Sequence, residues 1–501
     1  MLLGQKTQDD HNAPRLLFVK ARIEGHYGEA SAPAQAPMVL GALAREQGWE
    51  VRCIDTYLES QPERIIQETI KGFKPEVFGL SALTAESKSM HRFATLIREA
   101  APKALILAGG AHASAEPEET LSNVAFDAAV LGEGEVTLKE ILQRHARNLP
   151  WRDVDGIAFR DELGAVRKTS SRAYIEDLDT LPFPAWDLTD IDAYANRRGM
   201  SLIGQRRYMP VSTSRGCPYR CIYCHDINGK RFRGHSPQYV LRMIDELRDR
   251  YDVHDFDITD DIFNFDAQRL LTICDGLIAR GPGIGFTCPN GIRADRMTVE
   301  LADRMARAGC QYVAIAVETV TPRLQKEIKK RLKLSRVQPI IDAFTSRHVF
   351  TSGFFMLGFP NETEEELRAT IDFAVNSKLH AAYFFVVTPF GATEMHQYLS
   401  NTYGKASTQL RGVGMYLRPV TNYSRVPDRR FYKIRREAYW RFYFSPDRIR
   451  RIWNDHPRHR DLLQYAATMF LRDSLRIDPG RVLGPWIRVR SSLERLIGQN
   501  D

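Results

Sequence analysis

Three cysteines carry the strongest chemical signal in this chain of 501 residues. Cys217, Cys221 and Cys224 follow the spacing CxxxCxxC in a loop that also contains Gly216 and Pro218. Soft thiolates spaced this closely can bind one metal centre together. A [4Fe–4S] cluster normally takes four cysteines, so three ligands leave one iron open to bind a reactant. The spacing therefore predicts an iron–sulfur cluster that takes part in a reaction.

Two other interpretations of the three thiols are a zinc site and a cluster protein without a substrate. A closed zinc site needs a fourth ligand, and the adjacent His225 is a poor candidate because neighbouring residues rarely reach one ion together. A cluster protein that only transfers electrons or senses redox state, without a substrate, would usually supply four cysteines. The remaining cysteines stand singly in apolar stretches, where small buried thiols are common: Cys53, Cys274, Cys288 and Cys310.

The elements around this loop predict a partial (β/α)6 TIM-like barrel. Six strand patterns alternate with helical patterns, at 211–214, 255–259, 284–287, 312–317, 351–357 and 382–387. A complete barrel of eight units typically needs about 250 residues, and this stretch is shorter. Active-site groups are expected where the strands end, which is where the cysteine loop lies.

The N-terminal part predicts a second α/β unit, a doubly wound parallel sheet. Strand patterns at 15–20, 51–55, 77–81, 104–108 and 126–131 alternate with helical patterns. Such sheets bind ligands beyond the carboxyl ends of their strands. No GxGxxG follows the first strand, which disfavours a dinucleotide. The expected organisation is a domain over 14–145, a linker with a short hairpin over 146–205, the barrel over 206–395 and an α-helical appendage over 396–501.

Composition places the protein among ordinary soluble ones, with 43% hydrophobic and 26% charged residues. No apolar run is long enough for a transmembrane segment, and few, odd-numbered cysteines favour a cytoplasmic location with reduced thiols. The basic excess is local: residues 401–501 hold 21 Lys and Arg against 9 Asp and Glu. Without a recognition motif, no nucleic acid is expected as a partner.

The cysteine loop, with Tyr223 before its last cysteine, and the barrel together resemble the radical S-adenosylmethionine superfamily over about residues 209–390. The resemblance implies that Cys217, Cys221 and Cys224 bind a [4Fe–4S] cluster. Its open iron would chelate the amino and carboxylate groups of S-adenosylmethionine, and reductive cleavage would yield a 5′-deoxyadenosyl radical.

The same resemblance implies roles for residues that follow the later strands. Asp260 and Asp261 would contact the methionine amino group, Arg293 the methionine carboxylate, and Glu318 the ribose. Gly358 would let the backbone approach the adenine. Many relatives have Glu-Ser-Gly where this chain has Glu-Thr-Val. A turn-capping aspartate and a surface arginine are the plain alternatives.

The N-terminal unit resembles the cobalamin-binding subclass of this superfamily in three loops at strand ends. The residues that carry this resemblance are Ser81, Thr84, Gly109, Gly110, His112, Gly132, Glu133 and Gly134. Tight strand-to-helix turns would also account for the glycines. The DxHxxG motif of other cobalamin enzymes is absent, so we expect cobalt without a histidine ligand below it. His112 is expected to contact the cobalamin tail.

These resemblances imply a cobalamin-dependent radical enzyme that methylates an unactivated carbon of a small-molecule substrate by way of methylcobalamin. The alternative is a radical cyclase that forms rings oxidatively, because the basic, aromatic C-terminus resembles the anaerobic magnesium-protoporphyrin ester cyclase-like branch. That C-terminus would bind an anionic substrate or an acidic electron donor such as flavodoxin or ferredoxin, unless it is simply a solvated face. S-adenosylhomocysteine among the products would distinguish methyl transfer from cyclisation.

Overall fold

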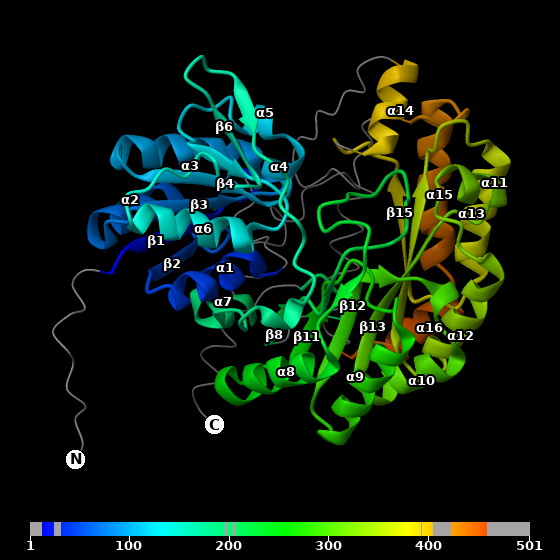
Figure 1. The fold of residues 1–501 in the computed structure, drawn as a ribbon. Helices are drawn as coiled ribbons and strands as arrows, with labels where there is room; N and C mark the ends of the chain where they lie inside the picture. The colour runs from blue at the N-terminus through cyan, green and yellow to red at the C-terminus, as the bar shows by residue number, and fades with distance from the viewer. Residues whose placement is uncertain are drawn as a thin grey trace.

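The computed structural model describes residues 13–24, 32–195, 199–203, 207–391, 393–403 and 422–457. Two α/β units lie side by side, the N-terminal one drawn in blue to cyan and the barrel in green to orange (Figure 1). Each unit is built on a parallel sheet, so the predicted fold class is confirmed.

The N-terminal sheet has seven strands in the order β2-β1-β3-β4-β5-β6-β7. The first five strands in the chain pair in parallel, in the doubly wound order of flavodoxin-like sheets. The bounds are β1 Arg15–Lys20, β2 Glu50–Asp55, β3 Val77–Ser81, β4 Leu105–Gly109, β5 Ala128–Val130, β6 Ile157–Arg160 and β7 Val166–Lys168.

Helices cover both faces of this sheet, which explains why β1 is apolar along its length. Leu17 and Val19 pack with residues of α2 (Pro62–Phe73) and α3 (Ser87–Ala100). Leu16 and Phe18 face the other way, with residues of α1 (Gln35–Glu46) and α6 (Gly134–Ala146). A strand buried on both faces is a continuous hydrophobic run.

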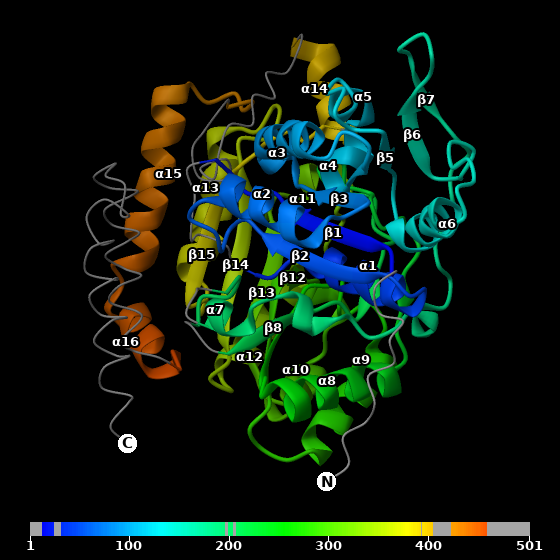
Figure 2. The same ribbon diagram turned by 90° about the vertical axis from the view of Figure 1, so that its left-hand side faces the viewer.

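The hairpin expected inside a linker extends this sheet instead. β6 pairs antiparallel with β5, and β7 pairs with β6 (Figure 2). Ile157 and Ala158 are buried there, so the hairpin shares the core of the N-terminal unit. The sheet therefore continues past residue 145, the expected end of the domain.

The barrel sheet has six parallel strands in the order β15-β14-β13-β12-β11-β8. Its bounds are β8 Tyr208–Val211, β11 Asp255–Ile258, β12 Gly285–Ile292, β13 Cys310–Glu318, β14 Phe350–Leu357 and β15 Ala381–Val386. A separate antiparallel ribbon joins β9 (Ser214–Arg215) to β10 (Arg233–Gly234). The six expected strands are thus present, and the first begins three residues earlier than expected.

The other helices follow the predicted alternation except at one place. Their bounds are α4 Gly110–Ala115, α5 Pro117–Thr120, α7 Ile191–Ala195, α8 Pro237–Tyr251, α9 Ala267–Ala279, α10 Val299–Arg307, α11 Pro322–Glu327, α12 Val337–Thr345, α13 Glu364–Asn376, α14 Glu394–Tyr403, α15 Asp428–Tyr443 and α16 Pro446–Asp455. Between β13 and β14 the chain forms two separate helices, α11 and α12, in place of one. Lys329 and Arg331 have positive φ angles, which a right-handed helix excludes.

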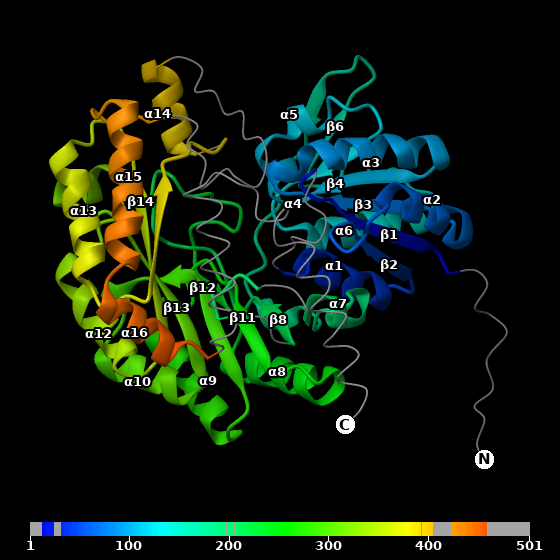
Figure 3. The same ribbon diagram turned by 180° about the vertical axis from the view of Figure 1, so that it is seen from behind.

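The C-terminal helices close the open edge of the barrel (Figure 3). Tyr443 Oη lies 3.3 Å from both Ala382 N and Ala382 O of the edge strand β15. Arg435 Nε donates to Phe384 O over 2.8 Å. Side chains of α15 thus bond backbone groups that an edge strand leaves unpaired, which accounts for part of the aromatic and basic composition there.

Within the described ranges, no helix has the length and apolar character that a membrane span requires.

Candidate active site at the junction of the two units

The cysteine loop is closed by the β9–β10 ribbon and requires Gly216 at its start. Gly216 has a φ angle of +82°, and a Cβ atom there would lie 2.1 Å from Arg231 O. Its N–H donates to Asp261 Oδ2 over 2.8 Å, and Asn228 Nδ2 donates to the same oxygen. Asp261 therefore holds the two ends of the loop together, a contact additional to its predicted role.

The donor set of this loop fits an iron–sulfur cluster better than a zinc ion. Cys224 N donates to Cys221 O over 3.1 Å, and the side chains of the two cysteines share a hydrogen bond. This hydrogen bond, followed by the positive charge of Lys330, lowers the pKa of Cys221. The His225 ring is tilted by 47° against the Phe390 ring, with centroids 5.3 Å apart, and burial lowers the pKa of His225.

The distances between possible ligand atoms test separately whether the three thiols could bind a single zinc ion. Among the described residues, the one triplet of His, Cys, Asp or Glu with ligand atoms within 4.8 Å of one another lies elsewhere, in the N-terminal unit. The three thiols thus do not converge as ligands of a single ion do. A larger centre such as a [4Fe–4S] cluster suits three separated thiolates.

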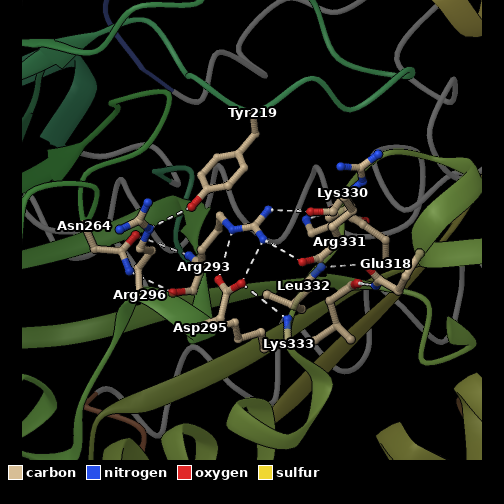
Figure 4. Close-up of polar contacts among 12 residues, drawn as sticks. Tyr219, Asn264, Arg293, Asp295, Arg296, Glu318, Lys330, Arg331, Leu332 and Lys333 are labelled. Atoms are coloured by element: carbon tan, nitrogen blue, oxygen red, sulfur yellow. Dashed lines mark hydrogen bonds and ion pairs between the residues drawn. The ribbon is translucent and has the colours of Figure 1, made fainter.

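Lys330, which the sequence analysis missed, forms a buried ion pair beside the cysteine loop. Its Nζ lies 2.9 Å from Glu318 Oε1 (Figure 4). The same atom lies 3.4 Å from Tyr223 Oη. Glu318 ends β13 with a φ angle of +66°, uncommon for a residue with a side chain. The break between α11 and α12 brings Lys330 to the cysteine loop. Because this position depends on the fold, no sequence motif marks the residue.

Arg293 connects the end of β12 to the cysteine loop (Figure 4). Its guanidinium lies 3.7 Å from the ring centroid of Tyr219 and makes two hydrogen bonds, of 3.0 and 2.9 Å, to Asp295. Arg293 Nη1 also donates to Lys330 O over 3.0 Å. The predicted contact between Arg293 and a methionine carboxylate remains a prediction.

Asp260 is buried beneath the strand that leads into the cysteine loop. Its carboxylate accepts hydrogen bonds from Thr213 N and Thr213 Oγ1, both 2.6 Å, and from Ser214 Oγ, 2.5 Å. Burial raises its pKa, an effect that the charge of Arg269 opposes. Asp260 thus positions the loop, while its contact with a ligand amino group remains a prediction.

Gly358 lies on the side of the barrel covered by α15. Its φ angle is +90°, and a Cβ atom there would lie 3.2 Å from the Phe431 ring. Its N–H donates over 2.6 Å to Glu362, whose pKa burial raises to about 8. Glycine accommodates this left-handed backbone, and the contact of Gly358 with adenine stays a prediction.

The loops at the strand ends of the N-terminal unit leave open space above their backbone. Nothing lies within 4 Å of an ideal Cβ at Gly109 or at Gly132, which has a φ angle of +69°. Gly110 is closely packed, since its Cβ would lie 3.0 Å from Ser81 Oγ and Ala82 O. A bulky ring can approach backbone that lacks side chains, so these two open glycines fit cobalamin.

Three further residues predicted to contact cobalamin lie near the strand ends of this unit. Ser81 is the last residue of β3 and pairs with Gly109 of β4, and Thr84 follows three residues later. Gly134 begins α6 and packs toward Val130 and Leu40.

Glu133 bridges the two units instead of facing an open loop. Its Oε1 lies 3.1 Å from Arg215 and 2.9 Å from Arg233, and its Oε2 accepts from Ile175 N over 2.9 Å. Glu135 adds a 2.6 Å ion pair with Arg215. These contacts use both carboxylate oxygens of Glu133, and the contact of Glu133 with cobalamin remains a prediction.

The His112 side chain faces Glu119. Its ring is 3% exposed, and its Nε2 lies 2.6 Å from Glu119 Oε2. Nδ1 is enclosed and has no hydrogen-bond partner among the described residues. The contact expected between His112 and the cobalamin tail remains a prediction.

Comparisons with known proteins match both units. The B12 binding domain model matches residues 30–142, and the Radical SAM superfamily model matches residues 211–374. An uncharacterized methyltransferase of Pyrococcus horikoshii is 29% identical over 420 residues, 81% of this chain and 87% of that one. The anaerobic magnesium-protoporphyrin IX monomethyl ester cyclase of Rubrivivax gelatinosus is 24% identical over 395 residues, 77% of this chain and 70% of that one.

A solved structure shares the fold of both units. It is the radical S-adenosylmethionine methyltransferase TsrM from Kitasatospora setae, with a TM-score of 0.66 and 18% identity, covering 78% of this chain and 79% of that one. The chain thus carries a B12 binding domain followed by a Radical SAM domain.

Proposed function

We propose that this enzyme transfers a methyl group from S-adenosylmethionine to an unactivated carbon of a small organic substrate. Its cofactors are cobalamin, S-adenosylmethionine and a [4Fe–4S] cluster. When bound, they supply a methyl carrier and a source of a carbon-centred radical, chemistry that protein side chains lack.

The observation that carries the proposal is the ion-paired bridge between the cysteine loop and the cobalamin loop. Arg215 lies two residues before Cys217, and it contacts Glu133 and Glu135 next to Gly132 and Gly134. The two loops that the cofactors need therefore meet at one junction. A substrate held there would lie within reach of both cofactors, as coupled radical formation and methyl transfer require.

The protein's own residues would bind the cofactors and orient them. Cys217, Cys221 and Cys224 hold the cluster, and Arg293 and Glu318 lie on the strand ends beside it. Lys330 neutralises Glu318 and lies close enough to Cys221 to favour its thiolate. We propose that this group receives the methionine and ribose parts of S-adenosylmethionine.

Asp260 and Asp261 would keep the cysteine loop in the shape that the cluster needs, and Gly358 would lie near the adenine. In the N-terminal unit, the open backbone at Gly109 and Gly132, with Ser81 and Thr84 at the same edge, would receive cobalamin. The other domain bounds expected from the sequence remain proposals as well, while the hairpin over β6 and β7 extends the N-terminal sheet past residue 145.

An external electron donor completes the proposal, because cleavage of S-adenosylmethionine needs an electron that the substrate does not supply. An acidic flavodoxin or ferredoxin would suit the excess of 21 Lys and Arg over 9 Asp and Glu in residues 401–501. Reduced thiols and an oxygen-sensitive cluster favour the cytoplasm as the location.

Isotope labelling tests methyl transfer without knowledge of the substrate. The protein, loaded anaerobically with cluster and cobalamin, is reduced and incubated with S-adenosylmethionine that carries a trideuterated methyl group. We expect a corrinoid heavier by one trideuterated methyl group in the mass spectrum. An unlabelled corrinoid, with 5′-deoxyadenosine still formed, would favour the cyclase alternative.

A further inference from the structure

Two imidazoles and one carboxylate converge in the N-terminal unit, on residues that the mechanism does not use. They are His91 of α3, His112 of α4 and Glu119 of α5. One ligand atom of each residue lies within 4.8 Å of the other two, the one such triplet in the described part of the chain. His112 Nε2 lies 2.6 Å from Glu119 Oε2, and His91 Nε2 lies 3.2 Å from Glu119 Oε1.

These separations are close to those of a tetrahedral zinc site. Zinc binds imidazole nitrogen and carboxylate oxygen at about 2.0–2.1 Å, which places two tetrahedral ligand atoms about 3.3 Å apart. His91 Nε2 lies 3.3 Å from Glu119 Oε2, the oxygen that also contacts His112, so this pair already has this spacing. The pair formed by His112 and Glu119 must open by roughly 0.7 Å, and the Glu119 side chain, 51% exposed, is free to move outward.

The surroundings hold both rings in place before any ion binds. The His91 ring packs edge-on against Phe126, with centroids 6.0 Å apart, and Asn123 Nδ2 donates to His91 O over 2.9 Å. The His112 ring is buried and presents only Nε2 to Glu119.

We propose that His91, His112 and Glu119 bind one Zn²⁺ ion, with water in the fourth position. The donor set of two imidazoles and one carboxylate suits zinc. Water has access, since the His91 and Glu119 side chains are 20% and 51% exposed. The ion would fasten α4 and α5, which directly follow Gly109, to α3. It would thereby stabilise the loop proposed to receive cobalamin, although zinc binding itself does not depend on the proposed function.

Zinc content of the loaded full-length protein tests this site. The cluster must be in place so that the cysteines are occupied. After incubation with zinc chloride and gel filtration, we expect one zinc ion per chain by elemental analysis. His91→Ala and Glu119→Gln should each lose it, with the iron content unchanged. His145→Ala, on α6 of the same unit, is the matched control and should keep the ion.

X-ray absorption at the zinc edge identifies the ligands independently. We expect nitrogen and oxygen scatterers at about 2.0 Å and no sulfur at about 2.3 Å. Sulfur scattering would place the ion on the cysteines and overturn the proposal. Equal zinc content in the wild type and in both site variants would overturn it too, as would a wild type that retains no zinc.

Discussion

Arg215→Met tests whether the buried bridge holds the two units together. Methionine keeps a long apolar side chain but removes the charge that pairs with Glu133 at 3.1 Å and Glu135 at 2.6 Å. Glu133 keeps its contact with Arg233, whereas Glu135 loses the ion-pair partner described for it. The Glu135 side chain is 9% exposed, so an uncompensated charge stays buried.

The expected destabilisation follows from this burial. Breaking a buried ion pair by removing one partner costs about 3–5 kcal/mol. For a domain of about 150–250 residues, each kcal/mol lowers the melting temperature by roughly 2–4 °C. We therefore expect the first thermal transition of the loaded, anaerobic protein to fall by roughly 6–20 °C. Circular dichroism measures this shift.

Matched variants separate the bridge from a general loss of charge. Arg45→Met removes a pair with Asp187 whose side chains are 38% and 51% exposed, so a much smaller shift is expected. Adding Glu135→Gln to Arg215→Met should restore part of the lost stability, because it removes the unpaired charge. A shift no larger than that of Arg45→Met, or no recovery in the double variant, would refute the reasoning.

Four further substitutions test other parts of the structure. Cys221→Ala should abolish the visible absorbance of the cluster and all cleavage of S-adenosylmethionine; a normal iron content would contradict the assignment. Gly216→Ala should lower the iron content several-fold, because the new Cβ would lie 2.1 Å from a backbone oxygen; full iron loading would show that the loop tolerates the change. Lys330→Met should destabilise the protein by about 3–5 kcal/mol in chemical denaturation, since it leaves Glu318 buried and unpaired; an unchanged denaturation midpoint would argue against the buried pair. Burial raises the pKa of Glu362 to about 8, so the stabilising contribution of its protonated form is complete below about pH 4.5 and is lost as the pH rises through 8. Glu362→Gln should therefore make the melting temperature less dependent on pH over this range. A pH dependence equal to that of the wild type would be evidence against the raised pKa.

Sequence patterns predicted the parts of the fold that depend on periodicity. Buried parallel strands such as Arg15–Lys20 are continuous apolar runs, and all eleven predicted strands are present. The cysteine spacing predicted the superfamily, because the ligands of one cluster lie close together in the chain. Helix ends that depend on a left-handed backbone were not predictable, as the break at Lys329 and Arg331 shows.

Contacts between distant segments were beyond the reach of the sequence. Glu133 and His112 were expected to face cobalamin because they lie in loops at strand ends. Their partners, Arg215 and Glu119, decide where these side chains point, and no local pattern indicates such pairings. Lys330 was missed for the same reason, since only the folded chain brings it to Glu318.

Quantification of both nucleoside products tests the central claim most directly. The loaded, reduced protein is incubated with S-adenosylmethionine and no added substrate, and the products are measured by liquid chromatography and mass spectrometry. We expect S-adenosylhomocysteine in an amount equal to the bound cobalamin, together with 5′-deoxyadenosine that Cys221→Ala fails to form. The absence of S-adenosylhomocysteine from protein with a full complement of cobalamin would contradict the account.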